Sequence, residues 1–312
     1  MAPAVFPHID NVQGAYGTVK ISTIITTHNR AAWLRQAIES VLAQEPCGAE
    51  VELIVVDDDS SDDTPAVVAS YPSVRYLRTK QGKASGSREV GIARASGEWI
   101  AFLDDDDAWL PHKLKECCRV MRAHPEARFI TSAAIICDHE LRPAGGVWLG
   151  PDLNGDRSAY DAFLTVPVSP SVVVMRRDVL ATVGLFDSSL SRADDFDLWL
   201  RVASSGVRCA STDEALILYR EREWQDGWLL HRSYRETVAV LRRSFAPGNP
   251  WRPSWRRRRD VYRHYRGWYT HWVMQAAREA RERREEVLAA RLRRTAFNMS
   301  PLHAAKGLLR GS

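Results

Sequence analysis

Two hydrophobic periods alternate along the first two thirds of the chain. Short runs rich in β-branched residues, such as KISTIITT at 20–27, predict buried strands. Between these runs apolar residues recur at helical spacing, as at Leu34, Ile38 and Leu42, which we expect on one buried helix face. The predicted strands are 20–27, 51–56, 74–78, 98–103 and 129–137, and the predicted helices are 28–44, 64–70, 85–96, 113–123 and 194–206. This alternation predicts an α/β fold with a mostly parallel sheet and helices on both faces.

The rest of the chain departs from this alternation. The stretch 142–155 is rich in Gly and Pro, and we expect a strand followed by a short helix in 168–187. From about Gln225 the pattern changes to long Arg-rich helices with interleaved Trp and Tyr. The expected division is an N-terminal extension at 1–19, an α/β domain at 20–224 and a basic helical C-terminal region at 225–312.

Composition excludes several classes of protein. Of the 312 residues, 45% are apolar and 26% charged, so neither wholesale disorder nor an integral membrane protein is expected. The first twenty residues lack the basic start and long apolar stretch of a secretory signal, and we therefore expect a cytoplasmic protein. The five cysteines are scattered without a C-x-x-C pair, which favours reduced packing residues.

Charge is divided unevenly along the chain. Residues 251–312 hold fifteen Arg and one Lys against four Glu and one Asp, a net charge of +11. Because the whole chain carries +4, residues 1–250 carry −7. An acidic body with a basic tail indicates that the two parts face different partners.

Two predicted strands end in runs of aspartate. The strand at 51–56 continues into DDDSSDDT, and the strand at 98–103 continues into four aspartates at 104–107. Because ligands gather at the carboxyl ends of strands in such sheets, both clusters indicate one edge as the site. Four adjacent carboxylates repel one another unless a cation lies among them, and oxygen ligands favour Mg²⁺, Mn²⁺ or Ca²⁺. A solvated acidic turn is the alternative at 104–107, and a loop with Asx-turns and a helix cap at Asp63 or Thr64 is the alternative at 57–64.

Other nucleotide and metal motifs are absent from the sequence. No G-x-G-x-x-G follows the first strand and no P-loop occurs. An EF-hand that starts at Asp57 or Asp104 would place Val68 or Lys115 where glutamate is needed. A role in handling phosphates would therefore depend on metal and arginine.

Five blocks of sequence together resemble a family 2 glycosyltransferase of the GT-A fold. The blocks are ISTIITTHNRAAWLRQAIESVLAQ, VELIVVDDDSSDDT, GEWIAFLDDDDAWLPHKL, VSPSVVVMRRDVLATVGLFD and ADDFDLWLRVASSG. They occur in the family's order and cover roughly residues 20–220. The resemblance implies a GT-A sheet and a nucleotide-sugar-dependent transferase.

The resemblance also implies roles for individual residues. The family's base-contacting aspartate matches Asp58, and Thr26 and His28 match residues that line the same pocket. The D-x-D motif falls on Asp104 and Asp106, which are expected to hold Mn²⁺ or Mg²⁺ on the donor pyrophosphate. Further implied residues are Asp105 beside the sugar or ribose, Asp194 and Asp195 in the acidic pair, and Asp195 in particular as the catalytic base.

Some positions depart from the family pattern. The common A-R-N-x-G-I block is S-R-E-V-G-I here, so Glu89 replaces Asn while Arg88 is retained for the donor side. Asp194 replaces the more usual Glu, and Asp195 has a second interpretation as the N-cap of the following helix. Ser169 and Ser171 are expected near the donor or acceptor sugar, or in a plain strand turn.

These residue types suit a single displacement at the anomeric carbon. A bound metal can neutralise the departing nucleoside diphosphate, and a carboxylate can take the proton of the attacking hydroxyl. We therefore expect an inverting transferase that moves a sugar from a nucleotide diphosphate, most simply UDP, to a hydroxyl acceptor. The alternatives are a catalytically silent GT-A-like binding module and a nucleotidyltransferase, for which the segment ITTHNRAAW lacks a Gly-rich triphosphate loop.

The basic tail has more than one interpretation. Its helices are expected to pack aromatic stripes on the body with Arg outward, through Trp224, Trp228, Trp251, Trp255, Trp268 and Trp272. The competing interpretation is peripheral contact with an anionic membrane that carries a lipid-linked acceptor, or with an acidic polymer. Nucleic acid is not expected as a partner, because no recognised motif accompanies the charge. The acceptor itself stays open between a glycan, a lipid-linked sugar and a small molecule.

Overall fold

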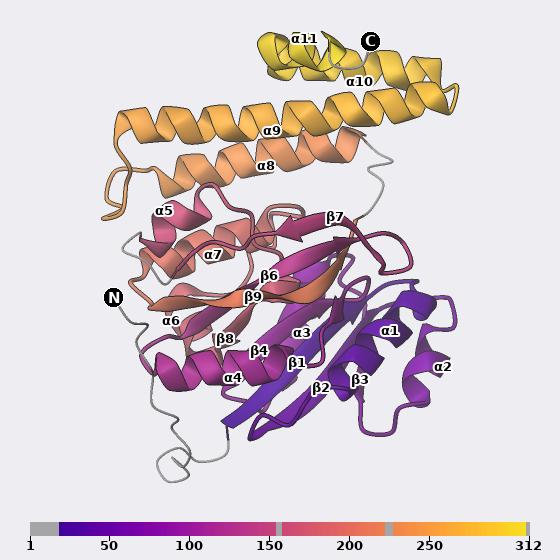
Figure 1. Cartoon of the computed structure of the whole chain (residues 1–312), viewed down its shortest axis with the longest axis vertical. Helices are drawn as coiled ribbons and strands as arrows, with labels where there is room; N and C mark the ends of the chain where they lie inside the picture. The colour runs from indigo at the N-terminus through magenta and orange to yellow at the C-terminus, as the bar shows by residue number, and fades with distance from the viewer. Residues whose placement is uncertain (1–18, 154–157, 222–226, 310–312) are drawn as a thin grey trace, which may run out of the picture.

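One mixed sheet with helices on both sides forms the body of the chain (Figure 1). The computed structural model describes residues 19–153, 158–221 and 227–309. The sheet has nine strands, in the order β3-β2-β1-β4-β8-β6-β9-β5, with β7 paired to β6. The strands are β1 (Val19–Thr27), β2 (Ala49–Asp58), β3 (Arg75–Thr79), β4 (Trp99–Asp104), β5 (Ala108–Trp109), β6 (Phe129–Cys137), β7 (Pro143–Trp148), β8 (Val174–Arg176) and β9 (Cys209–Arg220).

The helices of the body lie between these strands, as the alternating pattern predicts. They are α1 (Ala31–Leu42), α2 (Thr64–Ala69), α3 (Ala84–Arg94), α4 (Lys113–Ala123), α5 (Ala159–Phe163), α6 (Arg177–Val183) and α7 (Asp194–Ser204), with a 3-10 turn at Pro170–Val172. The predicted fold class is confirmed. One detail was wrong: Leu42 is 47% exposed, because the buried face of α1 runs through Leu34, Ala37, Ile38 and Val41.

The first four strands form the parallel half of the sheet. The central strand β1 pairs with β2 on one side and β4 on the other, and β2 pairs with β3, all in parallel. Its Ile21, Ile24 and Ile25 are at most 1% exposed, which explains the continuous apolar run of a strand covered on both faces. Helix α3 lies close over this strand, since a Cβ at Gly91 would come within 2.6 Å of Ile24 Cγ2.

The second half of the sheet is mixed. Strand β8 pairs antiparallel with both β4 and β6, while β9 runs parallel to β6 and antiparallel to β5. The hydrophobic pattern did not predict β5, β7 or β9. Strand β5 has two residues, β7 lies in the Gly/Pro-rich stretch 142–155, and the apolar pattern of β9 is broken by the polar residues 211–214.

Four helices follow the body in layers: the first two lie next to it, and the last two pack on the second, farther from the body (Figure 1). They are α8 (Gly227–Ser244), α9 (Trp255–Glu282), α10 (Glu286–Met299) and α11 (Pro301–Leu309). Leu230 and Leu241 of α8 and Tyr265 and Val273 of α9 belong to the same hydrophobic core as the sheet. The expected packing of aromatic residues on the body is therefore present for part of the tail.

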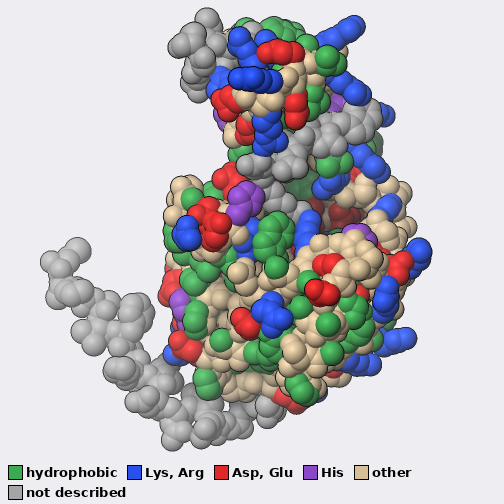
Figure 2. Space-filling model, turned by 90° about the vertical axis from the view of Figure 1, so that its right-hand side faces the viewer, with side chains coloured by type: hydrophobic (Ala, Val, Ile, Leu, Met, Phe, Trp, Pro, Cys, Tyr) green, Lys and Arg blue, Asp and Glu red, His purple; other side chains and the backbone are tan. Residues whose placement is uncertain are grey.

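The tryptophans of the tail differ in their surroundings. Trp268 and Trp272 pack partly buried against the core, whereas Trp251 and Trp255, around the α8–α9 turn, are 43% and 59% exposed. Trp224 and the side chain of Trp228 lie outside the described residues. Figure 2 shows Lys and Arg side chains on the upper lobe, which these helices form, interspersed with acidic side chains. Among the described helices, none is both long and apolar enough to span a bilayer.

Candidate active site

The ends of three neighbouring strands bring the predicted donor-side residues together. In the parallel register Thr26 stands opposite Val56 of β2 and opposite Asp104 of β4, at the carboxyl edge of the sheet. Asp58 is the last residue of β2, next to this position. The expected gathering of both aspartate clusters at one sheet edge is therefore present in the structure.

The loop between β3 and α3 holds Asp58 in place. One carboxylate oxygen of Asp58 accepts the backbone N–H groups of Gln81 and Gly82, at 2.5 and 3.1 Å. The exposed His28 donates from Nδ1 to the backbone carbonyl of Asp58 at 2.7 Å. His28 and Asp58 thus lie next to each other at the carboxyl edge of the sheet. Among the described residues no hydrogen bond reaches the second carboxylate oxygen of Asp58, so that oxygen can accept one from a ligand.

The neighbouring aspartates of the 57–64 cluster are structural. Asp57 is fully buried, accepts the hydroxyl of Tyr76 at 2.5 Å, and accepts the N–H of Ser60, three residues on, at 2.9 Å. Asp62 closes an Asx-turn with the N–H of Thr64 at 3.0 Å. The Asx-turn interpretation therefore accounts for Asp62, and local hydrogen bonds account for Asp57. Asp63 occupies the N-cap position of α2 but makes no side-chain capping bond.

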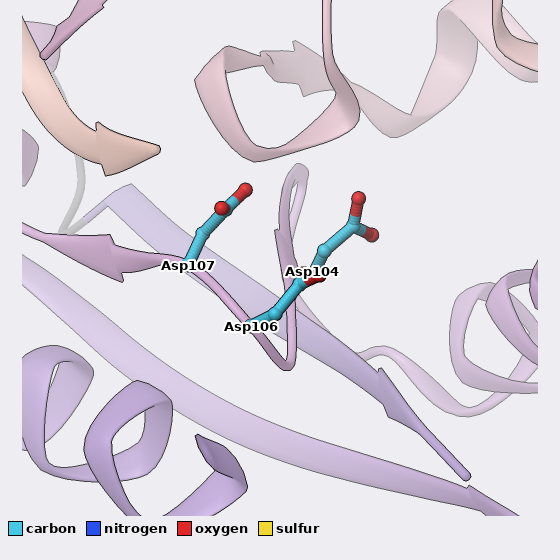
Figure 3. A group of neighbouring side chains, drawn as sticks. All are labelled: Asp104, Asp106 and Asp107. Carbon is cyan, nitrogen blue, oxygen red and sulfur yellow. The ribbon is translucent and has the colours of Figure 1, made fainter. Parts of the chain in front are cut away.

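The second aspartate cluster lies on the turn between β4 and β5 (Figure 3). Asp104, Asp106 and Asp107 each place a carboxylate oxygen within 4.8 Å of the others. Asp106 and Asp107 are at most 2% exposed, so this turn is not the solvated acidic turn of the alternative interpretation. Three hard oxygen donors at this spacing form a suitable set for Mg²⁺ or Mn²⁺.

Electrostatics around this turn also fit a cation. Burial, together with the charges of Asp106 and Asp104, raises the pKa of Asp107 well above its usual value. Burial raises the pKa of Asp105 to about 6, although Arg30 acts to lower it. The second carboxylate oxygen of Asp105 is buried without a hydrogen-bond partner among the described residues. A divalent ion would relieve the repulsion among these carboxylates.

Two arginines at this turn were not predicted as site residues. Arg30 pairs with Asp105 at 2.8 Å and with Asp106 at 3.6 Å. Arg220, at the end of β9, is buried, donates from Nε to the Asp106 carbonyl at 2.7 Å, and donates its backbone N–H to Asp107 at 3.1 Å. Arg30 follows directly on the first strand, which is the one sequence signal for it. Arg220 lies more than a hundred residues after the turn in sequence, and the pairing of β9 with β5 brings it there.

Ser171 has a supporting position behind the turn. Its hydroxyl accepts the N–H of Asp104 at 3.0 Å and donates to Asp107 at 2.6 Å, and the residue is fully buried. Ser169 caps the short 3-10 turn by accepting the N–H of Ser171. Of the two interpretations given for these serines, the strand-turn role agrees with these contacts.

Arg88 joins the aspartate turn to the acidic pair. The guanidinium lies 2.5 Å from Asp104 Oδ1 and 3.6 Å from Asp194 Oδ2, and the residue is only 6% exposed. Burial acts to lower the pKa of Arg88, but the charges of Asp104 and Asp194 outweigh it and raise the pKa. Two carboxylate groups from distant parts of the chain therefore share one buried cation. Glu89, the replaced Asn position, accepts a backbone N–H from Phe186 instead.

The acidic pair opens helix α7. The N-cap position belongs to Ala193, so the interpretation of Asp195 as the helix N-cap was wrong. Asp195 is partly buried and accepts the N–H of Phe196 at 2.7 Å. Burial and the neighbouring charge of Asp194 raise the pKa of Asp195 to about 7, against the opposing effect of Arg88. A carboxylate with this pKa can accept a proton near neutral pH.

The arrangement thus contains two chemically distinct groups of carboxylates. One is a buried set of three oxygens suited to a divalent ion, and the other is a carboxylate suited to proton transfer. His28 and Asp58 lie beside the first group, at the same edge of the sheet. This combination can bind an anionic ligand through a cation and activate a hydroxyl near it.

Comparison with known sequences agrees with this description. The sequence model "Glycosyl transferase family 2" matches residues 22–184. The succinoglycan biosynthesis protein ExoO of Rhizobium meliloti is 29% identical over 244 residues, which cover 72% of this chain and 67% of that protein. The UDP-Glc:alpha-D-GlcNAc-diphosphoundecaprenol beta-1,3-glucosyltransferase WfaP of Escherichia coli is 27% identical over 206 residues, covering 64% and 76%.

Solved structures share the fold at low sequence identity. TarS 1–349 of S. aureus, in complex with UDP, has a TM-score of 0.61 at 17% identity and covers 94% of this chain and 92% of that one. The mannosyltransferase PcManGT from Pyrobaculum calidifontis, in complex with GDP-Man and Mn²⁺, has a TM-score of 0.57 at 16% identity, with coverage of 95% and 80%. At these identities the similarity concerns the fold alone, and it extends over the C-terminal helices.

Proposed function

Because the chain belongs to glycosyl transferase family 2, we propose that it transfers a sugar from a nucleotide diphosphate to an acceptor hydroxyl with inversion at the anomeric carbon. The observation that supports this best is the pair of carboxylate groups bridged by Arg88. One group can hold the leaving diphosphate through a cation, while the other can deprotonate the acceptor.

The donor in this proposal is a UDP-sugar. Asp58, held by two backbone N–H groups, is positioned to accept the imide N–H of a pyrimidine base, with His28 and Thr26 lining the same pocket. Arg88 and Asp105 complete the donor side, toward the diphosphate and the ribose or sugar. The name of WfaP specifies UDP-Glc, and TarS was solved with UDP, which supports the choice of base.

Mn²⁺ or Mg²⁺ is the proposed cofactor. Asp104 and Asp106 of the predicted motif would hold it, and the structure adds Asp107 as a third ligand candidate. When bound, the ion supplies positive charge that stabilises the departing diphosphate. The Mn²⁺ present in the PcManGT complex, a protein of the same fold, supports this assignment.

Asp195 is the proposed general base, with Asp194 beside it. The Asp195 carboxylate takes the proton of the acceptor hydroxyl while that oxygen forms its bond to the anomeric carbon. The bond from this carbon to the diphosphate oxygen breaks in the same step, and the electron pair leaves with the nucleoside diphosphate. Asp194 raises the pKa of Asp195 and anchors Arg88, so the pair acts as a unit.

A lipid-linked acceptor at an anionic membrane surface is the partner we propose. The α8–α9 turn presents the exposed Trp255 beside a groove that Arg242, Arg258 and Arg259 line. Exposed Trp next to Arg suits the level of phospholipid headgroups. The name of WfaP specifies a diphosphoundecaprenol-linked acceptor, which supports this choice over a glycan or a small molecule. We keep the proposed boundary at 224 between the α/β domain and this basic region.

A thermal-shift experiment tests the transferase proposal. UDP, GDP, dTDP and CDP are each added with and without Mn²⁺ to the wild type and to Asp106→Ala. At a hundredfold excess over Kd, a ligand that binds only the folded state adds about 2.7 kcal/mol to the free energy of unfolding. We expect UDP to stabilise the wild type only with Mn²⁺, and Asp106→Ala to lose this response.

The control is Asp178→Ala, which removes an exposed carboxylate paired with Arg128 and Arg176. This variant should keep the full UDP response. If no diphosphate stabilises the wild type despite a cooperative melt, the silent binding module becomes the better interpretation.

A further inference from the structure

The loop between α6 and α7 leads directly into the acidic pair and is fastened from both halves of the molecule. Lys83, just before α3, donates from Nζ to the carbonyls of Ser188 and Leu190, at 2.6 and 3.3 Å. From the other side, Arg243 of α8 pairs with Asp187 at 2.6 Å. The start of α7 is therefore tied both to the donor side and to the C-terminal helices.

Glu236 of α8 bonds two loop residues close to the acidic pair. Its Oε2 accepts the backbone N–H of Ser191 at 2.9 Å and that of Arg192 at 2.8 Å. Its Oε1 accepts the Ser191 hydroxyl at 3.0 Å and the Nε of Arg232 at 3.0 Å. Both carboxylate oxygens are thus engaged, and the bonded loop residues stand two and three positions before Asp194.

The chemistry of this contact fits a role in positioning. The Glu236 side chain is 14% exposed. Burial acts to raise the pKa of Glu236, but the N–H groups of Ser191 and Arg192 lower it, so the ionised form is the bound one. Ala193 at the N-cap of α7 has no side chain able to bond the free N–H groups of the first turn. The bonds to Glu236, together with those of Lys83 and Arg243, therefore set the direction in which the chain enters α7.

Helix α9 packs against the start of α7, next to the acidic pair. The ring of Tyr265 packs against that of Phe196, with centroids 5.5 Å apart. Its buried hydroxyl has no hydrogen-bond partner among the described residues. Asp195 lies close enough to raise the pKa of both Tyr265 and Tyr269, after burial as the main cause. The surroundings of the proposed base thus come in part from residues beyond 224.

We propose that Glu236 is a positioning residue for the acidic pair, and that α8 belongs to the catalytic unit. The inference rests on the proposed function, since it assumes that the position of Asp195 limits turnover. A displacement of a reacting group by about 1 Å can lower a rate about 100-fold. Loss of the Glu236 bonds should therefore reduce turnover without weakening donor binding.

The test compares three variants of the full chain. Glu236→Ala removes all four bonds, whereas Glu236→Gln keeps an amide oxygen that can accept the two backbone N–H groups. Asp161→Ala is the matched control, because Asp161 also joins the body to the tail, through Arg257 at 2.7 Å. UDP released from UDP-glucose in the presence of Mn²⁺ measures turnover with water as acceptor.

We expect Glu236→Ala to lower kcat about 10- to 100-fold with KM for UDP-glucose unchanged. Glu236→Gln should recover most of the loss, and Asp161→Ala should leave kcat unchanged. Equal kcat in Glu236→Ala and wild type, or an equal fall in Glu236→Ala and Asp161→Ala, overturns the inference.

Hydrogen exchange separates this inference from the proposed function. In Glu236→Ala the amides of Ser191 and Arg192 should exchange at least about 10-fold faster, while Asp161→Ala leaves them unchanged. Unchanged exchange in Glu236→Ala overturns the positioning role whatever the enzyme does. If the wild type neither releases UDP nor responds to UDP with Mn²⁺, the transferase proposal fails, and faster exchange at these amides still supports the role of Glu236 in holding the loop.

Discussion

The two carboxylate groups of the site are built in different ways. The aspartate turn at 104–107 follows a central parallel strand, and register places Asp104 opposite Thr26. The acidic pair at 194–195 begins a helix whose approach is held by Lys83, Glu236 and Arg243. The proposed ligands of the first group lie within one run of four residues, although Arg30, Ser171 and Arg220 reach this run from distant segments. The comparison teaches that the proposed metal ligands are neighbours in sequence, whereas the acidic pair meets Arg88 and the contacts that hold its approach only through the tertiary structure.

The largest expected effect concerns the base. Asp195→Asn should lower turnover about 10²- to 10⁴-fold, because the amide cannot accept the acceptor's proton. Binding of UDP with Mn²⁺ should be unchanged, since the aspartate turn is intact. UDP release and thermal shift measure the two effects. Asp178→Asn, an exposed carboxylate on α6, is the control and should keep its turnover; wild-type turnover in Asp195→Asn would exclude Asp195 as the base.

The second largest expected effect concerns Arg88, which joins the two carboxylate groups. Arg88→Ala leaves Asp104 and Asp194 without their shared buried cation, and we expect a loss of about 3–5 kcal/mol in the free energy of unfolding. Urea denaturation measures this loss. Arg94→Ala, at the exposed end of the same helix, should change the free energy by less than about 0.5 kcal/mol. A loss below about 1 kcal/mol in Arg88→Ala would mean that the two groups are not coupled through this residue.

The third prediction concerns the proposed membrane surface at the α8–α9 turn. Each Arg near an anionic bilayer contributes about 1 kcal/mol, so Arg242→Ala with Arg258→Ala should weaken vesicle binding about 30-fold. Co-sedimentation with vesicles of phosphatidylglycerol and phosphatidylcholine measures the binding. Arg281→Ala with Arg294→Ala removes the same charge from exposed positions on α9 and α10 and should have a smaller effect. Equal losses would indicate nonspecific attraction instead of a surface at the α8–α9 turn.

The smallest expected effect is on the pH profile. Asp195 must be ionised to act as a base, and its pKa is raised to about 7. We therefore expect kcat/KM to rise about tenfold per pH unit below pH 7 and to level off above it. Asp194→Asn removes the negative neighbour that raises this pKa, so the inflection should move to lower pH. A profile that is flat between pH 5 and 8 would contradict the assignment of Asp195.

Much of the donor side could be predicted from the sequence. Strand ends in a parallel sheet meet at one edge, so the runs after 51–56 and 98–103 had to approach each other once the strands were recognised. The sequence could not show that the second run forms a metal site, because Asp106 and Asp107 could equally have been solvated, and only the structure shows that they are buried. Asp107 belonged to the run of four aspartates among which a cation was expected, but the family motif implied only Asp104 and Asp106 as ligands. Arg30 was overlooked because its ion pairs cross 75 residues of sequence.

The amino-acid sequence by itself determined the fold class, the succession of strands and helices from β1 to β4 along the chain, and the sheet edge at which the aspartates gather. These properties follow from hydrophobic period and strand register, which act over neighbouring segments. Only the tertiary structure decided that Arg88 joins the two carboxylate groups, that Asp195 is not a helix cap, and that Glu236 holds the approach to α7. Such contacts depend on how whole elements pack, and no local pattern of residues specifies the partner of a buried charge.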